Sequence, residues 1–201
     1  MGVRHHIAVS RATRMTHATR FVAVAVLTAL ALCVPVQAQT PEIDEARLRA
    51  EAGDAEAQYT IGLTYDMGVP QDNAEAVRWY RLAADQGFAR AQYRLGTMYL
   101  RGFGVPQDDA EGVRWYRLAA DQSYVPALTN LGNMYETGEG VAQDYVQAYM
   151  WYDLAASQLC CQMLQRAIEH RYRVGGLMNS TQVAEARRLA REWDAAHPRE
   201  P

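Results

Sequence analysis

The segment LGTMYLRGFGV (residues 95–105) returns thirty-six residues further along the chain as LGNMYETGEGV (residues 131–141). The segment RWYRLAADQ (residues 114–122) returns at the same spacing as MWYDLAASQ (residues 150–158). An earlier copy covers residues 55–88 and is two residues shorter at its central turn. Three copies of one unit indicate a repeat protein, in which each unit buries its apolar faces against its neighbours.

Each copy divides into two helical stretches around a glycine-containing turn. An aspartate precedes the second stretch, and an acidic or amide residue follows it three positions later: Asp72 with Glu75, Asp108 with Glu111 and Asp144 with Gln147. This spacing predicts a capping box. In that motif the aspartate accepts a hydrogen bond from a backbone N–H, and the third residue reaches back to the N–H of the aspartate.

A glycine recurs inside the first helical stretch of every copy, as Gly62, Gly96 and Gly132. Glycine in a helix is unfavourable by roughly 1 kcal/mol relative to alanine. Its recurrence therefore predicts a close approach by the neighbouring helix, the one that carries Ala83 and Ala84 or their equivalents. The second stretch repeats a tryptophan at positions 79, 115 and 151, which we expect to lie buried between repeats.

The pattern Ala-x-x-x-Leu-Gly-x-x-Tyr-x-x-Gly-x-Gly-Val-x-x-Asp, followed by Trp-Tyr-x-x-Ala-Ala-x-Gln, resembles the Sel1-like repeat, a relative of the tetratricopeptide repeat. The resemblance covers residues 55–158. It implies an all-α fold, an α-solenoid of helix-pair repeats, and an adaptor or regulator that binds proteins. Some secreted members carry a cysteine pair in every repeat. This chain lacks those pairs, so their disulfides and suggested penicillin binding do not carry over.

The repeats also predict covers at both ends, because a terminal repeat cannot bury its outer face alone. We expect a capping half-repeat that starts at Thr40-Pro41 and a last helix that starts at Asn179, with Gln182 three residues on. The predicted segments are a cleaved signal peptide (1–38), the half-repeat (39–54), three repeats (55–88, 89–124 and 125–159), C-terminal capping helices (160–197) and a disordered tail (198–201).

The signal peptide is predicted from three features in order. Four arginines precede the apolar run of residues 21–34, and Val36-Gln37-Ala38 offers a small-x-Ala cleavage site. The run is shorter than the roughly twenty residues of a membrane-spanning helix. The alternatives are an uncleaved anchor and lipidation at Cys33, which Leu32 disfavours; translation from Met15 is a further possibility. We expect an exported, periplasmic protein with no membrane span after cleavage.

Charge and residue usage narrow the function. All twenty basic residues are arginine, and removal of residues 1–38 changes the formal net charge from −3 to about −7. This acidic balance disfavours nucleic acid as a partner. The absence of lysine excludes Ser-x-x-Lys acylases, P-loop nucleotide binders and Schiff-base enzymes. His170 and His197 show no metal-ligand spacing. We therefore expect no catalytic residue, no metal and no cofactor. The rival hypothesis is an envelope hydrolase acting on peptidoglycan or a β-lactam.

Cys160 and Cys161 fall at the junction between the third repeat and the C-terminal helices. In an oxidising compartment they could form a vicinal disulfide or an intermolecular bridge. The alternative is that both are small apolar residues that fill a turn.

Comparison of the copies separates the positions that packing constrains from those that it leaves free. The columns of Ala57, Ile61 and Tyr65 keep their character at i, i+4 and i+8, which predicts a buried stripe. The columns of Glu56, Thr60, Leu63 and Met67 vary. They read Arg90, Arg94, Thr97 and Arg101 in the second copy and Pro126, Asn130, Asn133 and Thr137 in the third.

These variable columns predict the partner-binding surface, on a concave face formed by the first helices. The expected contact residues are Arg90, Arg94, Thr97, Arg101, Asn130 and Asn133. Arginine forms bidentate bonds to carboxylates, so a protein partner with an acidic segment, or an anionic polysaccharide, would suit this surface. The alternative is a solvated face paired with neighbours such as Glu56. On the second helices, Glu75/Arg78, Arg81/Asp85, Glu111/Arg114 and Arg117/Asp121 are expected to be ordinary surface pairs.

Overall fold

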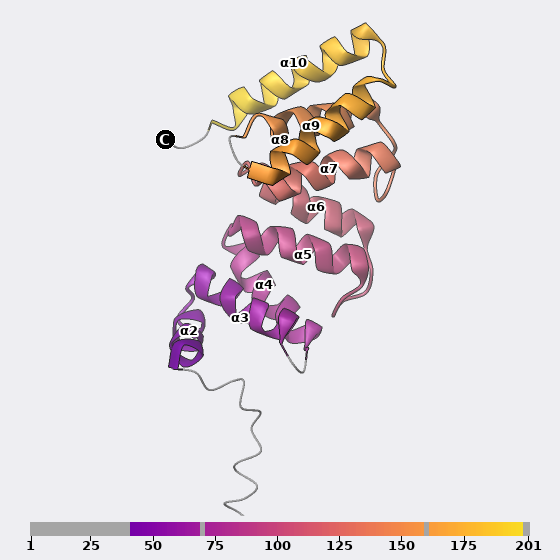
Figure 1. Ribbon diagram of the computed structural model, residues 1–201. Helices are drawn as coiled ribbons and strands as arrows, with labels where there is room; N and C mark the ends of the chain where they lie inside the picture. The colour runs from indigo at the N-terminus through magenta and orange to yellow at the C-terminus, as the bar shows by residue number, and fades with distance from the viewer. Residues whose placement is uncertain (1–40, 69–70, 159–160, 199–201) are drawn as a thin grey trace, which may run out of the picture. The chain divides into compact units, whose positions relative to one another are not determined.

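The computed structural model describes residues 41–68, 71–158 and 161–198, so the predicted signal peptide and Cys160 lie outside the described residues. Every regular element in the described part is a helix (Figure 1). The helices are α2 (Pro41–Glu51), α3 (Ala55–Met67), α4 (Asn73–Asp85), α5 (Ala89–Arg101), α6 (Asp109–Ala120), α7 (Val125–Thr137), α8 (Tyr145–Ala156), α9 (Cys161–Gly175) and α10 (Ser180–Ala196).

The helices form a stack of pairs. Helix α3 packs against α4, α5 against α6 and α7 against α8, and each of α4 and α6 also contacts the first helix of the next pair. Helix α2 covers the N-terminal pair, and α9 and α10 both pack against α8 (Figure 1). This arrangement is the all-α solenoid that the repeats predict.

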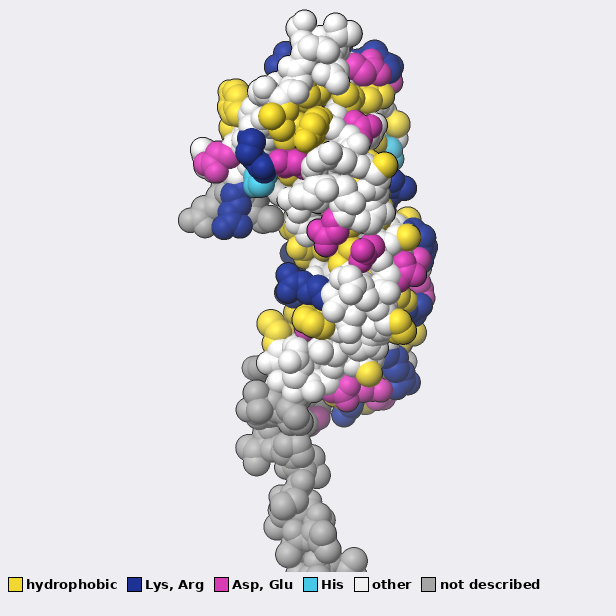
Figure 2. Space-filling view, turned by 90° about the vertical axis from the view of Figure 1, so that its right-hand side faces the viewer, with side chains coloured by type: hydrophobic (Ala, Val, Ile, Leu, Met, Phe, Trp, Pro, Cys, Tyr) yellow, Lys and Arg dark blue, Asp and Glu magenta, His cyan; other side chains and the backbone are white. Residues whose placement is uncertain are grey.

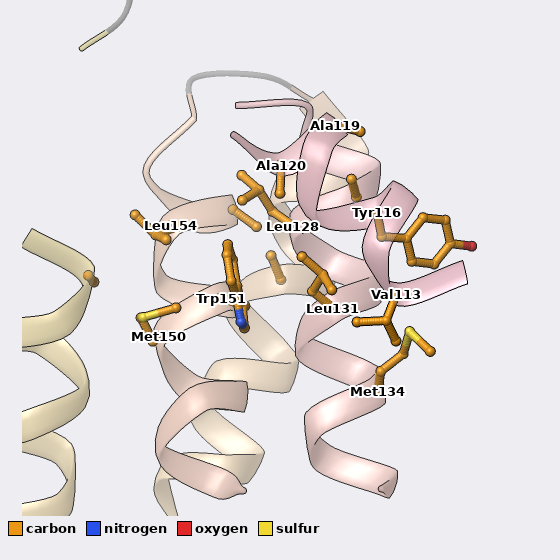
Figure 3. Packing of buried hydrophobic residues seen from close by; sticks show 14 residues of the cluster. Val113, Tyr116, Ala119, Ala120, Leu128, Leu131, Met134, Met150, Trp151 and Leu154 are labelled. Atoms are coloured by element: carbon orange, nitrogen blue, oxygen red, sulfur yellow. The ribbon is translucent and has the colours of Figure 1, made fainter. Parts of the chain in front are cut away.

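The recurrent tryptophans join successive pairs. Trp79 packs with residues of α2 and α3, and Trp115 packs with residues of α4 and α5. Trp151 shares the largest of these clusters with Leu131 of α7 and with Ala120 of α6, in the preceding pair (Figure 3). All three are at least 92% buried, since their exposed fractions are 8%, 4% and 6%. Their predicted burial between repeats is confirmed, and each side chain links one pair to its neighbour.

The recurrent glycines make room for tyrosine rings. A Cβ atom at Gly62 would lie 2.6 Å from the Tyr80 ring, and one at Gly96 would lie 2.7 Å from the Tyr116 ring. Gly132 faces Tyr152 in the same way. The neighbouring helix is the predicted one, but the contacting residue is the tyrosine rather than the alanines. The bulky ring reaches the first helix, and only a residue without a side chain leaves it space.

The capping-box prediction is correct in one half and wrong in the other. Asp72, Asp108 and Asp144 each accept a hydrogen bond from a backbone N–H in the first turn of α4, α6 or α8. The reciprocal bond is replaced, because the backbone N–H of each aspartate donates to the carbonyl of a tyrosine in the preceding helix, at 2.8–3.0 Å. The turn between the two helices is thereby closed by the backbone itself.

Two of the expected surface ion pairs are also replaced. Arg114 pairs with Glu111 and Arg78 with Glu75, as predicted. Arg81 and Arg117, however, donate to the hydroxyls of Tyr99 and Tyr135 in the following repeat rather than pairing within their own helix. Each of these bonds spans eighteen residues of sequence. They tie one repeat to the next, so these arginines are part of the stack.

At the junction between the third repeat and α9, the donor and the acceptor of this hydrogen bond are exchanged. The position of Arg117 is occupied one repeat later by Asp153, and the position of Tyr135 by Arg171. Arg171 donates to Asp153 across 2.6 Å.

Helix α10 begins at the predicted place, with a complete capping box between Asn179 and Gln182. Among the described residues no helix is both long and apolar enough to span a membrane.

Candidate partner-binding face

The predicted contact residues all lie on the first helices α5 and α7. Arg90, Arg101 and Asn133 are exposed, whereas Arg94, Thr97 and Asn130 are half-buried. Sequence comparison alone placed all six in one class of freely varying positions. The structure divides them into two groups, because Arg94 and Asn130 contact the preceding repeat and Thr97 contacts Tyr116 within its own repeat.

Arginine is distributed unevenly between the two sets of helices. Helices α5, α7 and α9 together carry six arginines and two glutamates, and one of these, Glu136, is only 8% exposed. Helix α3, the first helix of the first repeat, carries Glu56 and Asp66 and no arginine. Helices α4, α6 and α8 carry four arginines and five acidic residues. We call the exposed side chains of α5, α7 and α9 the basic face. Figure 2 shows the described unit from the side, with the surface stepping inward on its left and dark-blue side chains above and below that step.

Arg94 is held by an acidic residue of the preceding repeat. Its Nη1 atom lies 3.6 Å from Oδ2 of Asp66, and the Tyr80 hydroxyl donates to the same Oδ2 atom across 3.0 Å. Burial, and then the neighbouring Asp66 carboxylate, raise the pKa of Tyr80 well above its usual range. This tyrosine therefore remains a hydrogen-bond donor at neutral pH.

The third repeat contains an equivalent site around Glu136, which occupies the same column as Asp66. The Tyr152 hydroxyl donates to Oε2 of Glu136 across 2.9 Å, and Arg173 of α9 donates to the same carboxylate. His170 lies beside it, with Nδ1 3.7 Å from Oε2 and its ring centroid 5.0 Å from that of Tyr152. Burial, followed by the Glu136 carboxylate, raises the pKa of Tyr152 well above its usual range.

In the middle repeat, the hydroxyl of the equivalent tyrosine has hydrogen-bond partners that are not acidic. Leu100 occupies the column of Asp66 and Glu136 and packs over Gly112. The Tyr116 hydroxyl instead lies 3.0 Å from the Thr97 hydroxyl, and the Asn130 amide donates to it across 3.1 Å. Thr97 and Asn130 are therefore engaged in binding a core tyrosine.

Three predicted contact residues remain open to a partner. Within the described part of the chain, the side chains of Arg90, Arg101 and Asn133 make no hydrogen bond or ion pair. Arg94 is already neutralised by Asp66, at the distance given above. The acids Asp66 and Glu136 were missed by sequence reasoning. The sequence pattern that could have identified them is an acid in the first helix followed, fourteen or sixteen residues later, by the tyrosine of the second helix.

The described residues hold no cluster of three or more His, Cys, Asp or Glu side chains with the arrangement of a metal site. The repeat geometry above is matched by a known family: the profile of the Sel1 repeat fits residues 55–88, 89–124 and 125–158. The chain belongs to the Sel1 repeat family. Sel1 repeat proteins generally serve as protein–protein interaction scaffolds and are typically not catalytic.

Solved structures of Sel1 repeat proteins resemble this chain. One is a protective antigen present in uropathogenic Escherichia coli strains that displays an SLR fold. It is 32% identical with a TM-score of 0.72, over 79% of this chain and 34% of that one. Another is a Sel1 repeat protein from Oxalobacter formigenes, 38% identical with a TM-score of 0.57, over 63% of this chain and 98% of that one. The chain thus spans about a third of the length of the first. No curated protein sequence matches it.

Proposed function

We propose that this chain is an exported scaffold that binds an acidic segment of a protein partner on its basic face. The observation that carries the proposal is the placement of unpaired arginine. Arg90 and Arg101 are exposed at the two ends of α5, a helix that contains no acidic residue. On the opposite helices, Arg78 and Arg114 are each paired with a glutamate of their own helix, and Arg81 and Arg117 donate to tyrosine hydroxyls.

An acidic partner suits this surface for a physical reason. A guanidinium offers parallel N–H donors to a carboxylate, and such bidentate pairs are stronger than neutral hydrogen bonds. A solvated arginine can make this bond without breaking an existing one. Arg94 would have to leave Asp66 first, so its part in binding is to support the surface. Asn133 adds an exposed amide one helix away.

A photo-crosslinking amino acid placed at Asn133 tests the proposal in cells. The matched control places the same amino acid at Ala110, which is exposed on α6 in the opposite set of helices. We expect a crosslinked partner from position 133 and not from position 110, with capture that decreases as salt is added. Equal capture from both positions, or capture from position 110 alone, would contradict the proposal.

Export is a separate part of the proposal, and it rests on the cationic, apolar and Val-x-Ala segments of residues 1–38. We propose a periplasmic location in an organism with two membranes. The mature chain should begin at Gln39. Intact-mass measurement of the protein from the envelope fraction tests this, and a chain that retains residues 15–38 or a lipid on Cys33 would contradict it.

A further inference from the structure

Two pairs of aromatic rings lie at equivalent places in the first two repeats. Tyr59 of α3 contacts Phe88 with ring centroids 5.3 Å apart, and Tyr93 of α5 contacts Tyr124 at 5.5 Å. Phe88 and Tyr124 are the N-cap residues of α5 and α7. All four rings are half-buried. The two pairs therefore lie near the N-terminal ends of α5 and α7, two of the helices that form the basic face.

The third repeat shows that the solenoid does not require these rings. The column of Tyr59 and Tyr93 contains Thr129, and the column of Phe88 and Tyr124 contains Cys160. The third repeat nevertheless forms the same helix pair, with Trp151 and Tyr152 buried as in the other copies. The aromatic pairs are therefore an addition confined to the first two repeats and the start of the third.

The same place carries the open arginine. Burial, with Tyr59 and Tyr93 nearby, raises the pKa of Tyr124, and the charges of Arg90 and Arg94 oppose that shift. Arg90 and Tyr93 are three residues apart on α5, so Arg90 lies on the same side of that helix as the Tyr93 ring, which contacts Tyr124. Among the described residues, neither the Tyr124 hydroxyl nor the Arg90 guanidinium has a hydrogen-bond partner. Tyrosine and arginine are the residue types that most often dominate binding at protein interfaces.

We infer that Tyr93, Tyr124 and Arg90 form a subsite for a carboxylate-bearing residue that is followed by an aromatic or aliphatic side chain in the partner. This inference rests on the proposed function and adds the sequence chemistry of the segment. Arg90 binds the carboxylate, and the Tyr124 hydroxyl can donate a hydrogen bond to it. The adjoining ring faces receive the apolar side chain, as half-exposed aromatic rings do at interfaces.

Short peptides test the subsite without the natural partner. The probe is acetyl-Ser-Glu-Phe-Ser-amide, and the controls replace its glutamate with glutamine or its phenylalanine with alanine. Binding is followed by NMR of ring-labelled tyrosine as peptide is added, up to about 10 mM, because single-site contacts of this size give dissociation constants on the order of 1 mM. We expect saturable shifts with the probe and binding of each control peptide that is weaker by up to about fivefold.

Two variants place the binding on the named residues. Arg90→Gln changes an exposed side chain, and Tyr124→Gln removes a half-buried ring and its hydroxyl; each should weaken binding of the probe by up to about fivefold. Arg191→Gln, an exposed arginine of α10, is the matched control and should bind normally. The inference is overturned if the probe shifts no ring, if the glutamine peptide binds equally well, or if Arg90→Gln matches Arg191→Gln. Crosslinking at Asn133 would still stand in those cases, so the two proposals fail separately.

Discussion

The second helices and the first helices of the same repeats differ in what the repeats preserve. Along the second helices, a tryptophan, a tyrosine and an alanine recur at 79/115/151, 80/116/152 and 83/119/155, and all nine side chains are buried. Along the outward columns of the first helices, Glu56 is replaced by Arg90 and then by Pro126. Packing constrains the first set, whereas the second set is free to carry chemistry. Loss of a constant residue should therefore cost stability, and loss of an exposed variable residue should cost binding.

The largest effect is expected from Trp115→Ala. This side chain is 4% exposed and packs against α4 and α5 from its place on α6. Truncation of a buried tryptophan costs about 3–5 kcal/mol, through lost apolar contact and the cavity that remains. Urea unfolding followed by circular dichroism measures the change. Phe103→Ala is the control, because Phe103 is 42% exposed. Equal midpoints for the two variants would show that Trp115 does not join the repeats.

The second largest effect is expected from high pH, which should lower the free energy of unfolding through the buried tyrosines of the second helices. Burial and a nearby carboxylate raise the pKa values of Tyr80 and Tyr152 in the folded chain. Above pH 10 the unfolded chain releases these protons while the folded chain keeps them, so stability falls as pH rises. The slope is about 1.4 kcal/mol per pH unit for each tyrosine. Absorbance at the tyrosinate band should rise for these residues only as the protein unfolds. Exposed tyrosines such as Tyr172 contribute to the same band, so the readout is the difference between the wild type and Tyr80→Phe/Tyr152→Phe, and a difference that appears before unfolding would contradict the buried hydrogen bonds.

Gly96→Ala should destabilise by about 1–3 kcal/mol, because the added Cβ meets the Tyr116 ring. Helix propensity alone predicts the opposite sign, a gain of about 1 kcal/mol. The sign of the measured change therefore decides between local preference and packing. A stabilised variant would mean that the tyrosine can move aside at little cost.

Asp108→Ala should cost about 1 kcal/mol by removal of the N-cap of α6. Glu111→Ala should cost less, because the reciprocal bond of the capping box is absent and Glu111 instead pairs with exposed Arg114. Thermal melts of both variants at pH 7 make the comparison. A larger loss for Glu111→Ala would support the capping box that the sequence predicted.

The sequence predicted the repeat architecture, the tryptophan contacts and the start of α10 because each rests on a spacing that recurs or on a local cap. The errors share one cause, a partner that is distant along the chain. The backbone N–H of Asp108 is taken by the carbonyl of Tyr99, and Arg81 reaches the next repeat. Comparison of the repeats placed Arg94 and Arg90 in the same class of variable positions, because it cannot show that Asp66 lies beside Arg94.

The candidate site was therefore only partly predictable. The repeats identified which columns vary, and exposure then separated Arg90, Arg101 and Asn133 from the residues that support core tyrosines. Cys160 lies outside the described residues, so the alternatives for the two adjacent cysteines stay predictions.

The most direct measurement is the affinity of the crosslinked partner for the wild type and for Arg90→Gln/Arg101→Gln, at 0.1 M and 1 M salt. Arg94 stays unchanged because it is paired with Asp66. The control is Arg78→Gln/Arg191→Gln, which removes two exposed arginines elsewhere. The free energy of unfolding of the test variant should stay within about 0.5 kcal/mol of the wild-type value.

We predict weaker binding by Arg90→Gln/Arg101→Gln than by the control, and wild-type binding that falls with salt as the Debye length shrinks from about 10 Å to about 3 Å. Equal affinities for the two double variants would contradict a functional basic face, and an unfolded test variant would contradict the division between packing and binding columns.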